Sequence, residues 1–130
     1  MIASDFFDHG PDEGGIPDYQ SLRVICGSTE RAGAWTVARH YDVSVWLGSV
    51  ELDLRNARLA PGVTTIDIDV TFGSVEIIAP PELAIEVGMD AWAGSVEATT
   101  GFVLPEPGQP VVRLVGDARF ASCEIVRRAA

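Results

Sequence analysis

Acidic residues are numerous and regularly spaced in this 130-residue sequence, and their carboxylates could bind a cation. There are 19 acidic residues against 9 basic ones, and every basic residue is Arg. Five glutamates occupy the same place in a repeated tetrapeptide, namely Glu30, Glu51, Glu76, Glu97 and Glu124. Clustered carboxylates are ligands that hard divalent cations such as Ca²⁺ favour. The alternative is a solvated face that keeps the protein soluble. We predict this alternative, with no metal site and no cofactor.

Serines accompany the glutamates, but no pattern of nucleophilic catalysis surrounds them. They recur once in each repeat, as a requirement of the fold would produce, at Ser28, Ser49, Ser74, Ser95 and Ser122. The chain has no Gly-x-Ser-x-Gly elbow, and neither His9 nor His40 lies in a recognisable triad context. Without Lys it has no Gly-x-x-x-x-Gly-Lys phosphate loop. We therefore predict that the protein is not an enzyme and has no catalytic residue.

The overall charge and hydropathy exclude several classes of partner. A formal net charge of −10 disfavours nucleic acid and anionic membrane surfaces, because both are polyanions that require a basic footprint. No apolar run approaches the roughly 18 to 20 residues of a membrane span. The acidic N-terminus does not resemble a secretory signal. Since 47% of the residues are hydrophobic, we expect a folded, cytoplasmic protein without direct membrane insertion.

The acidic charge is concentrated at the start of the chain. Residues 1–20 hold five acids, no base, three Gly and two Pro. Such a segment buries too little apolar surface to offset its ordering entropy, so we predict a flexible acidic tail before a domain at 21–130. The apolar pair Phe6 and Phe7 within it is a candidate docking motif for a partner. The alternative is a tail that is unstructured or lies loosely on its own domain.

An internal repeat organises the rest of the sequence. Gly48-Ser49-Val50-Glu51 recurs at 73–76 and 94–97, with a weaker copy at 27–30 and a degenerate one at 121–124. Apolar residues alternate with polar ones on both sides of each copy, which is typical of β-strands. We predict that the chain bends at Gly27, Gly48, Gly73 and Gly94, because Gly tolerates backbone conformations that other residues do not. These glycines are then structural.

Strand units that each end in the same bend predict an all-β fold. We expect a single-stranded, right-handed, parallel β-solenoid, or β-helix-like stack, of about five rungs, with a loop at 101–110 between the fourth and fifth repeats. The alternative is a β-sandwich. One predicted inner column consists of Val50, Val75, Val96 and Cys123. A second consists of Leu47, Phe72, Ala93 and Phe120.

The two cysteines, Cys26 and Cys123, would lie in the first and fifth rungs of this stack. Four rung spacings of about 4.8 Å separate such rungs by roughly 19 Å. A disulfide tolerates Cα separations of only about 7 Å. We therefore predict that the two cysteines do not pair and that they are buried thiols.

Two tryptophans form the candidate contact patch. Trp46 and Trp92 each precede a residue predicted to face inward, so the alternation places both side chains outward, two rungs apart on one face. Exposed Trp residues are common at binding surfaces, so we predict a protein partner or self-association at this patch. The alternative is that loops or the N-terminal tail cover them. Trp35 is predicted to be structural.

Three segments carry a family resemblance. The run at 24–37 contains a Gly-rich bend, an acid, a basic residue and then Gly33-x-Trp35, and it is similar to the start of the C-terminal domain of LiaF-like proteins, the cell-wall-active antibiotic response proteins. The segment 46–57 (WLGSVELDLRNA) resembles the second motif of that family, and 72–81 (FGSVEIIAPP) resembles the third. The resemblance covers about residues 22–98. It implies a β-solenoid-like domain with a regulatory role in the bacterial cell-envelope stress response, acting by protein contact.

Two functions follow from these observations. The first is a non-catalytic interaction module of the envelope-stress response, cytoplasmic or held at the inner face of the membrane by a partner such as a membrane sensor or regulator. The alternative is a structural β-solenoid that assembles into oligomers or filaments, since the open ends of a solenoid expose strand edges.

Overall fold

The computed structural model describes residues 16–98 and 108–129. The predicted docking pair Phe6 and Phe7 lies outside the described residues, as does most of the predicted loop at 101–110. The first strand begins at Tyr19, within the segment 1–20 for which we predicted a flexible tail.

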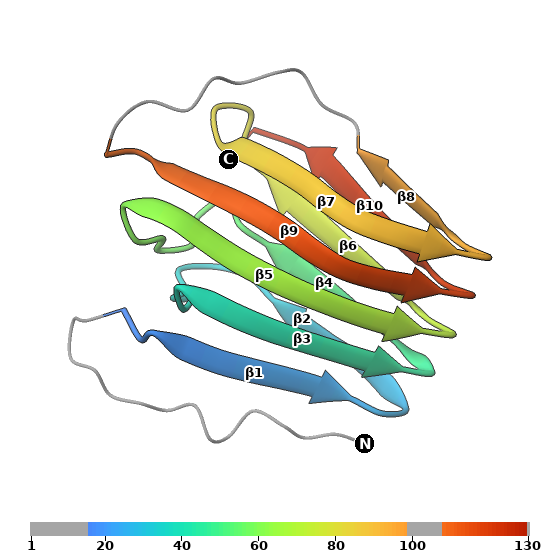
Figure 1. Ribbon diagram of the computed structural model, residues 1–130. Coiled ribbons are helices and arrows are strands. Elements are labelled where there is room, and N and C mark those ends of the chain that lie inside the picture. Colours follow the sequence, from blue (N-terminus) through green and yellow to red (C-terminus); the bar gives the residue numbers. More distant parts are fainter. Residues whose placement is uncertain (1–15, 99–107, 130) are drawn as a thin grey trace.

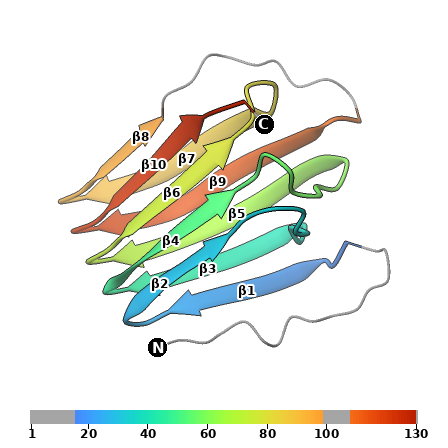
Figure 2. The same ribbon diagram turned by 180° about the vertical axis from the view of Figure 1, so that it is seen from behind.

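Ten β-strands build the described part of the chain, in which no helix occurs. The odd-numbered strands form one five-stranded sheet and the even-numbered strands form a second, and every strand pair is parallel (Figures 1 and 2). The strands are β1 (Tyr19–Val24), β2 (Gly27–Arg31), β3 (His40–Trp46), β4 (Gly48–Asp53), β5 (Gly62–Thr71), β6 (Ser74–Ala79), β7 (Ala84–Trp92), β8 (Ser95–Ala98), β9 (Pro110–Arg119) and β10 (Ser122–Arg127). Each repeat gives one strand to each sheet. The predicted all-β, parallel, solenoid-like class is confirmed, and the antiparallel pairing typical of a β-sandwich is absent from the described strands.

The order of the rungs differs from the expected one. The odd sheet has the order β1-β3-β5-β9-β7 and the even sheet β2-β4-β6-β10-β8. The fifth repeat therefore lies between the third and the fourth, and the fourth repeat forms the end of the stack (Figure 1). Stacking in chain order was the wrong expectation, because near-identical repeats can pair with several neighbours and the alternation of residues does not select among them.

The connection from β6 to β7 explains how the insertion is held. Residues 80–83 lead from the third rung to the fourth repeat and so pass the end of β10, which lies between them. At that end Arg127 Nη1 donates hydrogen bonds to the carbonyl oxygens of Leu83 at 2.7 Å, Pro80 at 2.9 Å and Pro81 at 3.3 Å. Arg127 thus fastens the crossing segment to the inserted repeat.

Removing this guanidinium should destabilise the fold. We expect Arg127→Ala to lower the free energy of unfolding by about 3 kcal/mol, because hydrogen bonds from a charged donor to several carbonyls are lost. Urea unfolding followed by circular dichroism measures the change. The matched control is Arg128→Ala, whose exposed side chain should contribute less than about 0.5 kcal/mol. Equal losses in the two variants would contradict this role of Arg127.

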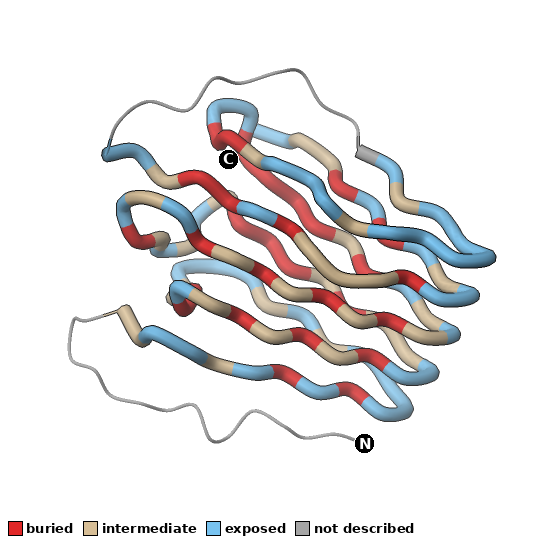
Figure 3. The backbone as a smooth tube through the Cα atoms, in the orientation of Figure 1, coloured by how far each residue is buried: buried red, intermediate tan, exposed pale blue. Residues whose placement is uncertain are grey.

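The hydrophobic core lies between the two sheets, and burial alternates along β3 and β5, whose buried residues belong to it (Figure 3). It contains Val43, Leu52, Ile66, Ile68 and Ile77, each with no exposed surface. The first predicted column is present, but its order is Val50, Val75, Cys123 and Val96, as the register of β4, β6, β10 and β8 requires.

The second predicted column is wrong. Leu47, Phe72, Ala93 and Phe120 have positive φ angles of 60°, 54°, 54° and 49°, and their side chains are exposed rather than inward. A left-handed residue at the corner turns its side chain away from the space between the sheets. Period-two counting cannot foresee this, because it assumes extended backbone throughout. A strained backbone of this kind costs of order 1 kcal/mol per residue, so these corners are unusual positions for the large apolar residues Leu47, Phe72 and Phe120.

The glycines that follow three of these corners are explained by close approach between rungs. A Cβ added to Gly48 would overlap the carbonyl oxygen of Gly27, and one added to Gly73 would overlap that of Gly48. The neighbouring rung therefore leaves no room for a Cβ at these two bends, although the inserted repeat carries Ala121 at the equivalent position. The close approach explains Gly48 and Gly73, whereas an added Cβ at Gly27 would meet nothing within 4 Å.

The two cysteines lie in different environments, and no disulfide joins them. Cys123 is buried in the core, and burial raises the pKa of its thiol to about 11. Cys26 is exposed after β1, so its predicted burial is wrong.

We expect a thiol reagent at pH 8 to label the native protein once, at Cys26, because the thiolate is the reactive form. In denaturant it should label the protein twice. Mass spectrometry of peptides from both samples identifies the labelled residue. Rapid labelling of Cys123 in the native protein would contradict the burial of that thiol.

Candidate aromatic contact site

Four aromatic side chains gather along the edge where the chain passes from the odd sheet to the even one. We call Trp46, Phe72, Phe120 and Trp92 the aromatic row, in their order along the stack. The two tryptophans end β3 and β7, and the two phenylalanines are the left-handed corner residues after β5 and β9. The row therefore crosses four consecutive rungs.

The rings of the row contact one another continuously. The ring centroids of Trp46 and Phe72 are 5.7 Å apart and nearly perpendicular. Those of Phe72 and Phe120 are 5.2 Å apart and stacked, and those of Phe120 and Trp92 are 5.1 Å apart and perpendicular. These are the edge-to-face and stacked arrangements that aromatic quadrupoles favour. All four residues are nonetheless about half exposed, and Trp92 is 65% exposed.

Only part of this site was predictable from the sequence. The expected outward direction of Trp46 and Trp92 agrees with their exposure, but three strand spacings separate them instead of two, because the fifth repeat lies between the third and the fourth. Phe72 and Phe120, which we had assigned to the core, bridge them. A Phe directly before the bend, in Phe72-Gly73 and in Phe120-Ala121, was the signal in the sequence.

A row of aspartates runs beside the aromatic row on the outer face of the odd sheet. Asp69, Asp117 and Asp90 are in register on β5, β9 and β7, and each lies two residues before the end of its strand. Burial, together with the charges of Asp67 and Asp117, raises the pKa of Asp69 above its usual value. Arg119 Nη2 lies 3.4 Å from Asp117 Oδ2, and both side chains are about half exposed. We call Asp69, Asp117 and Asp90 the acidic row.

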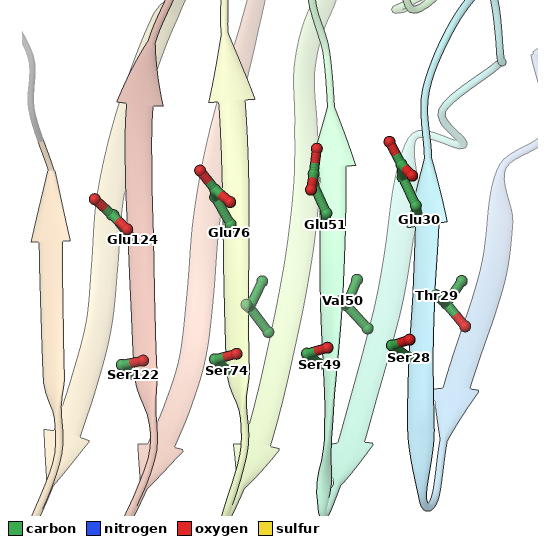
Figure 4. Close-up of a pocket in the computed structure, with 11 residues that line it drawn as sticks. Ser28, Thr29, Glu30, Ser49, Val50, Glu51, Ser74, Glu76, Ser122 and Glu124 are labelled. Atoms are coloured by element: carbon green, nitrogen blue, oxygen red, sulfur yellow. The ribbon is translucent and has the colours of Figure 1, made fainter.

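The outer face of the even sheet carries the repeated serines and glutamates. They line a groove of about 610 Å³ formed by four adjacent strands, with the glutamates in one line and the serines in another (Figure 4). Burial and the charges of Glu30 and Glu76 raise the pKa of Glu51. Within residues 16–98 and 108–129, no group of three or more His, Cys, Asp or Glu side chains is placed to hold a metal ion.

Trp35 and Asp53 form contacts that stabilise the fold. Trp35 Nε1 donates a hydrogen bond to the carbonyl oxygen of Asp53 at 2.8 Å, and its ring packs against Tyr41. Asp53 is buried, although strict alternation with Leu52 would place a side chain at this position outward. Its carboxylate receives bonds from Arg55 Nε at 2.9 Å and Nη2 at 2.7 Å, which hold the pKa of Asp53 below its usual value.

The fold and this edge define an all-β domain of stacked parallel rungs that presents an apolar row beside an acidic one. In the described ranges there is no helix with the length and hydrophobicity needed to cross a bilayer. Comparison with known families matches residues 26–101, more than half of the chain, to the family described as cell wall-active antibiotics response LiaF, C-terminal. The chain belongs to this LiaF-like C-terminal family, which associates it with regulators of the cell-envelope stress response. No curated protein and no solved structure matches the chain significantly.

The family match runs from β2 to just past β8. The inserted repeat of β9 and β10 therefore lies outside the matched residues. That repeat supplies Phe120 and Asp117, the members that make the aromatic and acidic rows continuous.

Proposed function

We propose that this chain is a non-catalytic protein-interaction module of bacterial cell-envelope stress regulation and that the aromatic row is its contact surface. The observation that carries this proposal is the exposure of four mutually contacting aromatic side chains on a domain of the LiaF-like family. Exposed contiguous apolar patches mark interaction sites, and Trp contributes strongly to binding energy at interfaces.

The proposed partner is a protein, such as a membrane sensor or regulator. In this proposal the module acts in the cytoplasm, or at the inner face of the membrane where its partner holds it. The net charge of −10 supports a protein partner over an anionic lipid surface or nucleic acid. The proposal gives the module no catalytic residue and no cofactor.

A pull-down from detergent-solubilised membranes of the native cell tests this function. We expect the wild-type chain to retain a sensor or regulator of the envelope-stress response. Trp46→Ser/Trp92→Ser should reduce its capture by at least about thirtyfold, because truncation of a single interfacial Trp costs about 2 kcal/mol or more. Val63→Ser, which changes an exposed apolar residue at the other end of β5, is the control. Unchanged capture by the Trp variant would refute a role for the aromatic row.

The alternative function, assembly into oligomers or filaments, is favoured by one observation. Among the described strands, β7 pairs on one side only, and Val87, which faces the core side of that strand, is 42% exposed. Unpaired edges of this kind promote association of copies. Sedimentation at several concentrations separates the functions: growth beyond a dimer supports assembly, and a monomer or dimer at all concentrations supports the module.

A further inference from the structure

We propose that the aromatic row binds a basic amphipathic segment of the protein partner, with apolar side chains on the four rings and Lys or Arg side chains on the acidic row. This inference rests on the proposed function and specifies the chemistry of the partner. It follows from the position of the two rows, the backbone of the corners and the ion pair between Arg119 and Asp117.

The two phenylalanines of the aromatic row occupy a backbone conformation that is unfavourable for Phe. Phe72 and Phe120 occupy left-handed backbone at φ 54° and 49°, where Gly or Asn would be comfortable. Their rings nevertheless remain half exposed and complete the contact between the two tryptophans. Strained residues that persist at an exposed position point to a function for their side chains. The row crosses three strand spacings, about 14 Å, which two to three turns of an amphipathic helix would cover.

The acidic row lies close enough to the aromatic row for one amphipathic segment to contact both rows. Asp90 and Trp92 are two residues apart on one strand and so face the same side, about 7 Å from each other along the strand. Asp69 and Asp117 stand in register with Asp90 on the neighbouring strands. Within the described residues, Asp69 and Asp90 form no ion pair. The charges of Asp67 and Asp117 act unfavourably on the Asp69 carboxylate, and Arg119 offsets them only in part, so a further cation beside Asp69 would be favourable.

Arg119 is an example, within the protein itself, of a guanidinium bound to the acidic row. It lies in register with Trp92 on one side and Thr71 on the other, and it approaches Asp117 to 3.4 Å. A partner's Arg or Lys would repeat this arrangement at Asp69 and Asp90. Cations also bind favourably over the faces of Trp rings. The same acidic row opposes docking of an anionic bilayer, and it opposes close approach of a second copy through the same face.

The test uses the full chain and two fluorescent peptides of about 18 residues, amphipathic helices of Leu with Lys and of Leu with Glu, in fluorescence anisotropy titrations. We expect the Leu/Lys peptide to bind at least about tenfold more tightly than the Leu/Glu peptide, with weaker binding when salt rises from about 50 to 200 mM. Phe72→Asn/Phe120→Asn removes the rings with a residue that suits the corner backbone, and it should lower the affinity about tenfold or more.

The charge requirement is tested separately. Asp69→Asn/Asp90→Asn should lower the affinity of the protein for the Leu/Lys peptide about tenfold. Glu76→Gln/Glu97→Gln removes the same amount of charge from the even sheet and should change this affinity less than about twofold. Four results would overturn the proposal: equal binding of both peptides, equal effects of the Asp and Glu variants, binding only to phosphatidylglycerol vesicles, or a dimer through the aromatic row that excludes the peptide.

The membrane pull-down keeps the two proposals distinguishable. Capture that is lost in the Phe variant but retained in the Asp variant would preserve the contact surface and refute a basic partner. Peptide binding that follows the acidic row, with no partner captured by the wild-type chain, would support the basic ligand and count against the proposed function.

Discussion

Gly116→Ala is expected to lower the free energy of unfolding by about 4 kcal/mol, a large share of the roughly 5 to 15 kcal/mol that stabilises a domain of this size. Gly116 lies within β9 at φ 121°, a backbone conformation that a residue with a Cβ adopts only under strain. The added Cβ would also overlap the carbonyl oxygen of Ile68 and lie 2.7 Å from its carbonyl carbon. Neither neighbour is a flexible side chain that could move aside.

The control for this substitution is Gly88→Ala on the adjacent strand. Gly88 lies on β7 in register with Val115, and the atom nearest to an added Cβ is the carbonyl oxygen of Leu114 at 3.8 Å, an ordinary contact. We expect a change within about 0.5 kcal/mol, as for most exposed substitutions. Urea denaturation curves of both variants measure the difference. If Gly116→Ala proved as stable as Gly88→Ala, the close approach of β9 to β5 would be refuted.

Leu114→Ala is expected to cost about 3 to 4 kcal/mol, and Val87→Ala less than about 1 kcal/mol. Leu114 has no exposed surface and lies between Ile66 of β5 and Val87 of β7, so its truncation leaves a cavity inside the stack. Val87, on the end rung, already has 42% of its surface exposed. The two substitutions therefore report which of the last two repeats is internal.

Rungs stacked in chain order would reverse this result, since β7 would then be enclosed and β9 would form the edge. Thermal or urea unfolding of the two variants provides the measurement. Amide hydrogen exchange offers an independent check, because amides of β9 and β10 should be protected more strongly than those of β7 and β8. A larger loss for Val87→Ala, together with stronger protection of β7, would contradict the inserted order.

Much of the architecture was predictable because it depends on residues that are close together in the sequence. The alternation around Ile66, Ile68 and Val70 identifies strands that are buried on one face, and the repeated Gly-Ser marks where each rung bends. The exposure of Trp46 and Trp92 follows from the same alternation. Where the backbone leaves the extended conformation, at Leu47 or Phe72, the alternation stops and the prediction failed.

Asp53 shows the other reason for failure. Its neighbours in the sequence suggest an outward side chain, yet Arg55 folds back to form a bidentate ion pair with it, and the carboxylate becomes buried. Pairing of a charge with a hydrogen-bonding partner permits burial that polarity alone would oppose. A prediction of burial from the polarity of each residue alone does not take such an ion pair into account.

The repeat, the alternating strands, the bends and hence a stack of parallel rungs were predictable from the amino-acid order, because these properties depend on the local succession of apolar, polar and glycine residues. The order of the rungs was not, and it is known from the folded structure. Strands with the same alternation can pair in several orders, and the choice depends on contacts between distant residues, such as Arg127 on the segment after β6 and Gly116 against Ile68. That order places Phe120 between Phe72 and Trp92, and Asp117 between Asp69 and Asp90. The continuous surface that we propose as the contact site is thus a product of the insertion.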